Sequence, residues 1–101
     1  MAIYMTAQYQ VHPSQIEKVK ESIRSLVTHV KNHERLTTIY IAQQEIIDSS
    51  KFMHVLRFEN EVALKIHQNS PASAQFVKTV YPQTIKPIEF MEYNLIATIN
   101  P

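Results

Sequence analysis

Residues 58–71 read FENEVALKIHQNSP, and this stretch decides the fold that we expect for the whole chain. Asn60 can begin a short helix, because Asn is one of the preferred N-cap residues, and Asn69 can end it. Pro71 then suits the first turn of a second short helix. His67 falls on the last turn of the first helix, where the helix dipole favours a cation. The stretch therefore predicts two helical pieces joined by a corner, with a titratable side chain beside it.

The segments on both sides of this corner are predicted to be strands. Residues 36–47 and 51–59 are rich in β-branched and aromatic side chains, and residues 48–50, Asp-Ser-Ser, are typical of a turn. These two strands should therefore pair as an antiparallel hairpin. A further strand is expected at residues 88–99, where the apolar positions shift phase near Phe90-Met91, as in a β-bulge.

The beginning of the chain supplies a strand and a long helix. Residues 2–11 alternate apolar and polar side chains, the pattern of a half-buried strand. Ser14 and Glu17 have the spacing of a capping box, so a helix is expected to begin there and to continue to about Asn32. The order β-α-β-β-α-β predicts one α+β domain over residues 1–101. Its arrangement is the ferredoxin-like split in which a four-stranded antiparallel sheet carries its helices on one face.

The other face of that sheet would remain bare. The alternating strands carry apolar side chains on both faces, so at least part of the bare face is apolar. An exposed apolar surface of this kind is typical of an interaction site. The simplest cover is the same face of a second copy, which predicts a two-fold homodimer with a shared core between its sheets.

The composition excludes several classes of site. The 101 residues include no Gly, so neither Gly-rich phosphate loop can hold ATP, NAD or FAD, and no Cys, so disulfides and thiolate chemistry are absent. Ten basic and nine acidic residues give a net charge of +1 without blocks of like charge, so neither nucleic acid nor a membrane surface is an expected partner. No apolar run spans a membrane and residues 1–4 do not resemble a signal peptide, so a cytoplasmic protein is expected.

The stretch quoted above, followed by Phe76, resembles the pattern of the antibiotic biosynthesis monooxygenase domain family: an aromatic residue, an acidic pair, Ala-Leu, a His, Ser-Pro and then a Phe. That family consists of small ferredoxin-like proteins that form dimeric α/β barrels, and it includes quinol monooxygenases. The resemblance therefore implies a homodimer and oxygenation without a cofactor. The chain departs from the pattern where Phe58 replaces the usual Trp, Leu56 a frequent Glu, Ala72 a frequent His, and Glu34-Arg35 the usual Pro-Gly.

Three residues are candidates for catalysis: His67, His54 and Arg57. A His is the natural general base near neutral pH, and Arg57 or a Tyr hydroxyl can stabilise an oxyanion. The alternative for His54 is a buried, neutral side chain, because it shares a strand face with apolar residues, and the alternative for His67 is a structural role at the corner. The aromatic residues expected to line a substrate pocket, or else a plain core, are Tyr40, Phe58, Phe76, Tyr81, Phe90 and Tyr93.

Metal binding is not expected. His29 and His33 are four residues apart on the predicted helix, but no carboxylate or third ligand is identifiable beside them. Their simpler role is to complement the dipole at the helix end.

A pocket without flavin, metal or thiol can still support oxygenation. A hydroquinone or polycyclic phenol, once deprotonated, gives an electron to O₂ itself, so the protein supplies position, a base and the exclusion of water. The resemblance thus implies a cofactor-free monooxygenase. The alternative is a non-catalytic dimer that binds a small aromatic ligand or acts as an interaction module.

Overall fold

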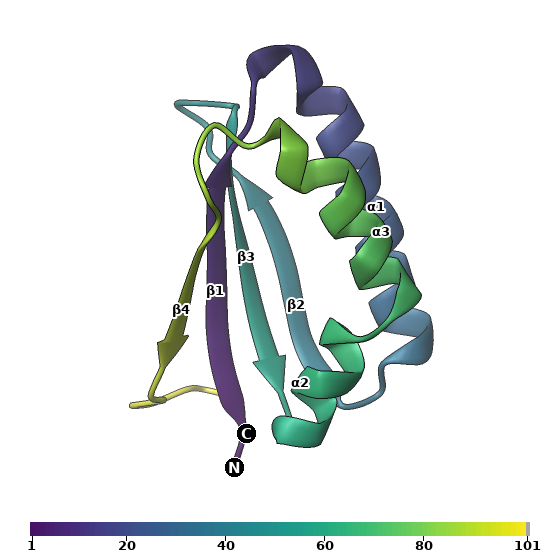
Figure 1. The fold of residues 1–101 in the computed structure, drawn as a ribbon. Coiled ribbons are helices and arrows are strands. Elements are labelled where there is room, and N and C mark those ends of the chain that lie inside the picture. Colours follow the sequence, from purple (N-terminus) through teal and green to yellow (C-terminus); the bar gives the residue numbers. More distant parts are fainter. Residues whose placement is uncertain (101) are drawn as a thin grey trace.

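The computed structural model describes residues 1–100 and has the ferredoxin-like α+β architecture that the sequence predicts. Its strands form one antiparallel sheet in the order β2-β3-β1-β4, and the helices lie on one side of that sheet (Figure 1). In chain order the elements are β1 (Ile3–Gln10), α1 (Ile16–His33), β2 (Thr37–Gln44), β3 (Lys51–Phe58), α2 (Glu61–Gln68), α3 (Pro71–Val80) and β4 (Glu89–Tyr93).

The register of the sheet decides which side chains face the helices. β1 pairs with β3 so that Ile3 lies opposite Phe58 and Ala7 lies opposite His54. Because side chains alternate along a strand, the members of each pair share one face of the sheet. Every second residue of β3, from Phe52 to Phe58, is buried against the helices. The residues between them point to the bare face.

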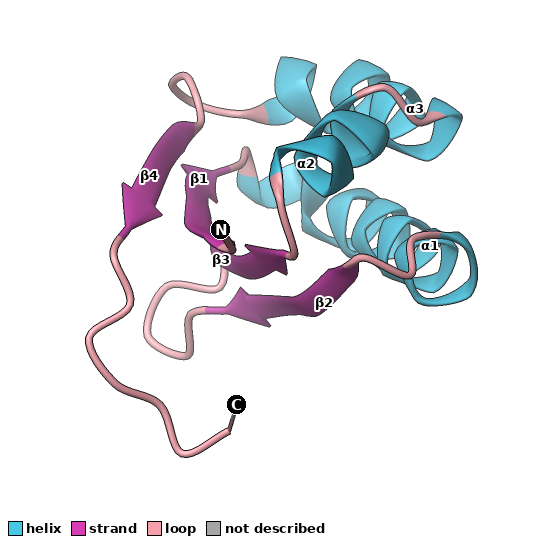
Figure 2. Ribbon diagram, turned by 90° about the horizontal axis from the view of Figure 1, so that it is seen from below, coloured by secondary structure: helices cyan, strands magenta, loops and turns pink. Residues whose placement is uncertain are grey.

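The main core lies between the sheet and helices α1 and α3. α1 is amphipathic, and it buries apolar side chains at helical spacing from Val19 to Val30. Phe76 of α3 joins the same cluster, together with Tyr9 and Phe52 from the sheet. Figure 2 shows α1 and α3 side by side over one face of the sheet, with α2 at the end of this layer. The helical layer is thus anchored mainly by α1 and α3.

The start of α1 differs from the expected capping box. Pro13–Gln15 form a short 3-10 turn, so Ser14 lies inside that turn and cannot act as the cap. α1 therefore begins at Ile16 without a side-chain cap.

The last strand is shorter than expected and has no bulge at Phe90-Met91. β4 keeps a continuous register with β1, and Tyr93 pairs with Tyr4 close to the start of β1. β1 begins at Ile3, one residue before Tyr4, so residues beyond Asn94 have no strand beside them. The irregularity in the sheet lies instead in β2, between Thr37 and Ile39.

The sheet face opposite the helices is uncovered (Figure 1). Its apolar side chains include Ile39, Ile41 and Met91, which are 37%, 48% and 58% exposed. The expectation that part of this face is apolar is therefore met within one copy of the chain.

Among the described residues, no helix is both long and apolar enough to cross a membrane.

Candidate active site

A cavity of about 490 Å³ lies between the helix-facing side of the sheet and helices α2 and α3. Its walls are mainly apolar, and a few polar groups reach it from the sheet and from α2. A concave apolar site with a few convergent polar groups is the usual form of a small-molecule site. The lining residues are Met5, Thr6, Ala7, Tyr9, Leu26, Tyr40, His54, Leu56, Phe58, Leu64, His67, Gln68, Ser73, Phe76, Val77, Tyr81, Ile88 and Phe90.

The corner between α2 and α3 has the helix boundaries that the sequence predicts, and it carries His67 to the cavity. Asn60 begins α2, and its side-chain oxygen accepts a hydrogen bond from the Ala63 N–H at 3.0 Å. Ser70 begins α3, and its hydroxyl oxygen accepts from the Ser73 N–H at 3.0 Å. Because both helix starts are capped, the corner is fixed and so is the last turn of α2.

A buried carboxylate from a distant part of the chain holds His67. Nδ1 of His67 lies 2.8 Å from Oε1 of Glu34, the residue that ends α1. An ionised carboxylate only accepts hydrogen bonds, so Nδ1 must donate its N–H. Nε2 of the neutral ring then carries the lone pair, and no residue within 1–100 donates to it. His67 therefore offers a free proton acceptor at the cavity wall.

Glu34 is itself almost completely buried, with 2% of its side chain exposed. Its Oε1 also accepts from the Thr37 hydroxyl at 3.1 Å. Its Oε2 has no hydrogen bond but lies 3.5 Å from Nε2 of His29, within the range of an ion pair. An isolated buried carboxylate is costly, so these partners explain how Glu34 is tolerated. The carboxylate is placed where it fixes the tautomer and orientation of His67.

His54 lies on the sheet side of the cavity with both ring nitrogens occupied. Its Nε2 is 2.7 Å from the hydroxyl oxygen of Tyr9, and its Nδ1 is 2.7 Å from that of Tyr40. The residue is 2% exposed. Burial, with a smaller contribution from His67, lowers the pKa of His54 to about 4. His54 is therefore neutral near neutral pH, which is the alternative that the sequence left open, and it is a poor candidate for the base.

The two phenols beside His54 keep their protons. Burial raises the pKa of Tyr9, and the nearby Tyr40 and Tyr81 raise it further. Burial also raises the pKa of Tyr40, and the charge of Glu34 adds to this effect. Both hydroxyl groups therefore take part in hydrogen bonds as neutral phenols.

Two residues expected at the site lie on the opposite face of the sheet. Arg57 follows His54 by three positions on β3, and its Nε donates to the Tyr4 hydroxyl at 3.0 Å while Nη1 donates to Glu59 at 2.9 Å. Tyr93 pairs with the same Tyr4 across β1 and β4. Because side chains alternate along a strand, neither residue reaches the cavity of its own chain. We therefore correct the expectation that Arg57 and Tyr93 share a pocket with the histidines.

The structure brings the other expected residues together around one cavity. They are His67, His54, Tyr40, Phe58, Phe76, Tyr81 and Phe90. The ring of His67 lies 5.4 Å from that of Phe58 and 5.8 Å from that of Tyr40, between centroids. Aromatic walls at this distance from a proton acceptor suit a flat aromatic ligand.

Comparison with known proteins identifies the family of this chain. Residues 2–79 match the profile of a family described as antibiotic biosynthesis monooxygenase. The chain belongs to that family. A solved antibiotic biosynthesis monooxygenase is 20% identical with a TM-score of 0.87, covering 96% of this chain and 100% of that one. No protein in a search of curated proteins matches the chain.

Two further structures named among the antibiotic biosynthesis monooxygenases share the fold. One from Bacteroides thetaiotaomicron is 11% identical with a TM-score of 0.91, covering 99% of this chain and 94% of that one. One from Nitrosomonas europaea is 15% identical with a TM-score of 0.87, covering 99% and 92%. At such identities the likeness shows the fold alone.

Sequence reasoning did not assign Glu34 or Tyr9 to the site, although each carried a signal. Glu34 stands where the antibiotic biosynthesis monooxygenase pattern usually has Pro-Gly, and an acidic residue at a helix C-terminus opposes the helix dipole. Such a residue needs another reason to be there. Tyr9 falls in the inward set of the first strand, and a buried phenol needs a hydrogen-bond partner.

The environment of His29 differs from the expectation that no carboxylate lies beside it. Glu34 supplies one, and the rings of His29 and His33 lie 4.9 Å apart between centroids. Even so, no group of three His, Cys, Asp or Glu within residues 1–100 is arranged to hold a metal ion. The two oxygens of this carboxylate lie against His67 and His29.

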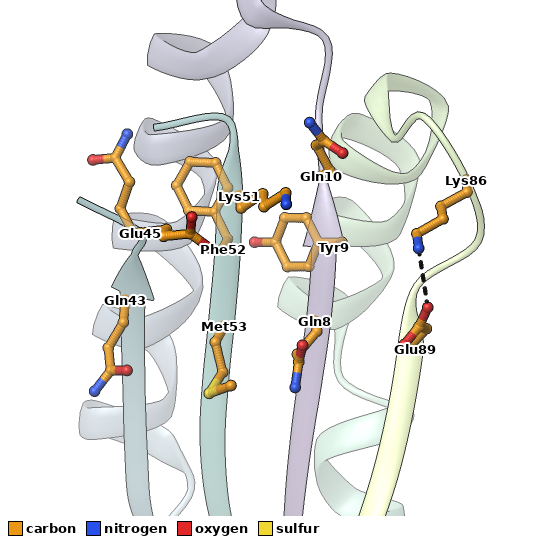
Figure 3. Close-up of a pocket in the computed structure, with 11 residues that line it drawn as sticks. Gln8, Tyr9, Gln10, Gln43, Glu45, Lys51, Phe52, Met53, Lys86 and Glu89 are labelled. Carbon is orange, nitrogen blue, oxygen red and sulfur yellow. Dashed lines mark ion pairs between the residues drawn. The ribbon is translucent and has the colours of Figure 1, made fainter. Parts of the chain in front are cut away.

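A second hollow, of about 430 Å³, lies at the end of the sheet near the β2–β3 hairpin (Figure 3). Its lining is mostly Gln, Lys and Glu, and Lys86 pairs with Glu89 at 3.2 Å across one wall. Figure 3 shows Gln8, Gln43 and Met53 pointing away from the helices. None of its lining residues is a His.

Proposed function

We propose that this member of the antibiotic biosynthesis monooxygenase family oxygenates a hydroquinone or polycyclic phenol with O₂, without a bound cofactor. One oxygen atom enters the ring as a carbonyl, and the other leaves as water. The substrate supplies all the electrons that reduce O₂, so a hydroquinone yields a hydroxyquinone and water, and a phenol yields a quinone and water. The protein needs to supply a base, an orientation and a dry site.

Nε2 of His67 removes the phenolic proton in the first step, because a phenolate gives up an electron far more readily than a phenol. The phenolate passes one electron to O₂, and the resulting ring radical and superoxide combine to form a peroxide at a ring carbon. His67 returns its proton to this peroxide. The O–O bond then breaks as the proton on the same ring carbon is lost, leaving a carbonyl and water.

The observation that carries the proposal is the pairing of His67 with the buried Glu34 at the wall of an aromatic cavity. The 2.8 Å contact holds the ring with Nε2 free to accept a proton. Once the proton has been taken, the carboxylate stabilises the imidazolium, as the acid of an Asp-His pair does in other enzymes. The ring of Phe58 beside His67 offers a surface on which a flat substrate can lie.

Oxygen uptake with a panel of hydroquinones and polycyclic phenols tests this proposal. We expect uptake above the uncatalysed autoxidation of at least one compound, with a label from isotopic O₂ in the product and no dependence on added flavin, haem or metal. A panel without any turnover, together with measurable binding of an aromatic compound, would favour the second candidate, a non-catalytic binding module of the same fold.

The proposed functional unit is a homodimer in which the bare sheet faces of two copies meet. We expect sedimentation of the purified protein at about twice the 11.8 kDa of one chain. Ile41→Arg should shift it to a single chain, because Ile41 is 48% exposed on that face and a cation there would be buried against its partner. Val62→Arg is the matched control, because Val62 is exposed on α2, on the helical side. A monomer in the unsubstituted protein would contradict the proposal.

A further inference from the structure

The hydrogen bonds around His54 leave one proton unused. Tyr9, His54 and Tyr40 form a continuous chain through the two ring nitrogens of a neutral imidazole. A neutral imidazole has one N–H and one lone pair, and each phenol has one O–H. The chain therefore has more protons than hydrogen bonds between its members. Whichever tyrosine accepts from His54 still has its own O–H to donate elsewhere.

Burial decides which tyrosine that is. The bond between Tyr9 and His54 is buried, and Tyr9 is 5% exposed. Its ring is stacked on Phe52 at 5.6 Å and meets the edge of Phe76 at 6.5 Å, between centroids. Tyr9 also lines the cavity, but its bond to His54 is buried, whereas the bond between Tyr40 and His54 is only partly buried. A spare O–H without an acceptor costs most on the more buried phenol, so Tyr9 is the donor to Nε2 of His54.

The direction of the rest of the chain follows from this step. With Nε2 accepting from Tyr9, the ring proton of His54 is on Nδ1, which donates to the hydroxyl oxygen of Tyr40. Tyr40 is only partly buried and lines the cavity, with its ring 5.8 Å from that of His67. Its O–H is thus the one that remains free, and it lies on the cavity side near the proposed base.

We propose that Tyr9, His54 and Tyr40 form a one-way hydrogen-bond chain that presents the Tyr40 O–H to an oxygen atom of the bound ligand. Tyr40 would touch the ligand, and Tyr9 and His54 are positioning residues that act through it. Donors in a row polarise one another, so the terminal O–H is a stronger donor than an isolated phenol. The ligand class that this group recognises is one with a carbonyl or phenolate oxygen.

This inference deepens the proposed function, and it rests on that function only in taking the cavity as the ligand site. It supplies the oxyanion donor that Arg57 cannot provide from the other face of the sheet. A donor aimed at the substrate oxygen favours the phenolate over the phenol, and so it assists proton removal by His67. It also fits the product, because a quinone oxygen accepts hydrogen bonds but cannot donate them.

The tautomer of His54 is the first test, and it needs no ligand. In ¹⁵N-labelled protein we expect the His54 proton on Nδ1, with the His54 signals assigned from the spectrum of a His54→Gln variant. Tyr9→Phe should reduce the share of this tautomer, because it removes the donor to Nε2, whereas a residue with a purely packing role would leave the tautomer unchanged. A proton on Nε2 in the unsubstituted protein, or an unchanged tautomer in Tyr9→Phe, would overturn the proposed direction of the Tyr9–His54–Tyr40 hydrogen bonds.

Binding of 1,4-naphthoquinone is the second test, with naphthalene as the matched ligand that lacks oxygen. Calorimetry with Tyr40→Phe should show naphthoquinone binding weakened by about 3- to 10-fold, the usual effect of losing one neutral hydrogen bond, and naphthalene binding unchanged. Tyr93→Phe is the control variant, because it removes a hydroxyl from the other face of the sheet. The protein has no Cys, so no thiol can add to the quinone during the measurement.

The outcomes separate this inference from the proposed function. No binding of naphthoquinone, or equal binding in Tyr40→Phe, would overturn the role of Tyr40. Weakened quinone binding in Tyr40→Phe, with no oxygen uptake on any hydroquinone or phenol, would support the donor and reject the oxygenase.

Discussion

Replacement of His67 by Gln is expected to lower the rate of oxygenation by a factor of about 10² to 10⁴, the usual contribution of a general base. The substitution removes Nε2, the only ring atom of His67 that is free to take the phenolic proton, since Nδ1 is bonded to Glu34. The binding cavity keeps its walls, so the loss should appear mainly in kcat and less in KM. Initial oxygen uptake with the best hydroquinone of the panel measures both constants.

The choice of Gln keeps the structural role of His67 as intact as possible. Its amide N–H can still donate to the carboxylate of Glu34, so that the buried charge is not left alone. His12→Gln is the matched control, because His12 is exposed and its side chain makes no cap hydrogen bond. Thermal unfolding of both variants shows whether the fold survives. Unchanged turnover in a folded His67→Gln protein would rule out His67 as the base.

Substitutions at Glu34 and His29 test which contact of the buried Glu34 carboxylate matters for turnover, the one with His67 or the one with His29. Glu34→Gln should also lose turnover, because a neutral amide no longer fixes the tautomer of His67 or stabilises its charged form. His29→Gln should cost less, since His29 reaches only Oε2, at 3.5 Å, whereas His67 contacts Oε1 at 2.8 Å.

The sequence was sufficient for the fold because its signals were local and agreed with one another. The N-cap residue Asn60 and the helix-starting Pro71 predicted the corner where the structure has it. The wrong prediction for the last strand arose because a local sequence pattern does not show how that strand pairs with its neighbour. The apolar phase shift near Phe90 predicts a bulge, but the register is continuous and the strand ends at Tyr93, opposite Tyr4 near the start of β1.

The errors at the site have physical reasons of the same kind. His54 and Arg57 are three positions apart on one strand, so their side chains point to opposite faces of the sheet. This alternation alone excludes a pocket shared by both residues in one chain. Phe90 and Tyr93 have the same spacing, and only the expected bulge made a shared face conceivable. The contact of His67 with Glu34, by contrast, joins residues 33 positions apart. It depends on the end of α1 meeting the end of α2, which no local pattern in the sequence reveals.

Acid is expected to destabilise the protein through His54 by on the order of 3 kcal/mol between pH 6.5 and pH 4. Burial lowers the pKa of His54 from an ordinary 6.5 to about 4 in the folded protein. Between these values the unfolded chain binds a proton at His54 and the folded protein does not, so acidification favours unfolding. The stabilising contribution is complete above pH 6.5, and it is lost as the pH falls toward 4. Urea unfolding at several pH values across this interval measures the slope.

A His54→Gln variant isolates this effect from the other titrating groups. The variant is expected to be less stable at pH 7, because it disturbs the bonds to Tyr9 and Tyr40, but its stability should fall less steeply with acid. Within the interval the unsubstituted protein should lose up to about 1.4 kcal/mol more per pH unit than the variant.

The His54 ring resonances should also stay in the neutral form down to about pH 5, because the lowered pKa of about 4 lies below that point. Parallel stability curves, or a His54 ring that protonates near pH 6.5, would show that the folded protein does not hold this imidazole neutral. Below that pH the direction of the Tyr9–His54–Tyr40 chain would then be lost, since an imidazolium donates from both nitrogens.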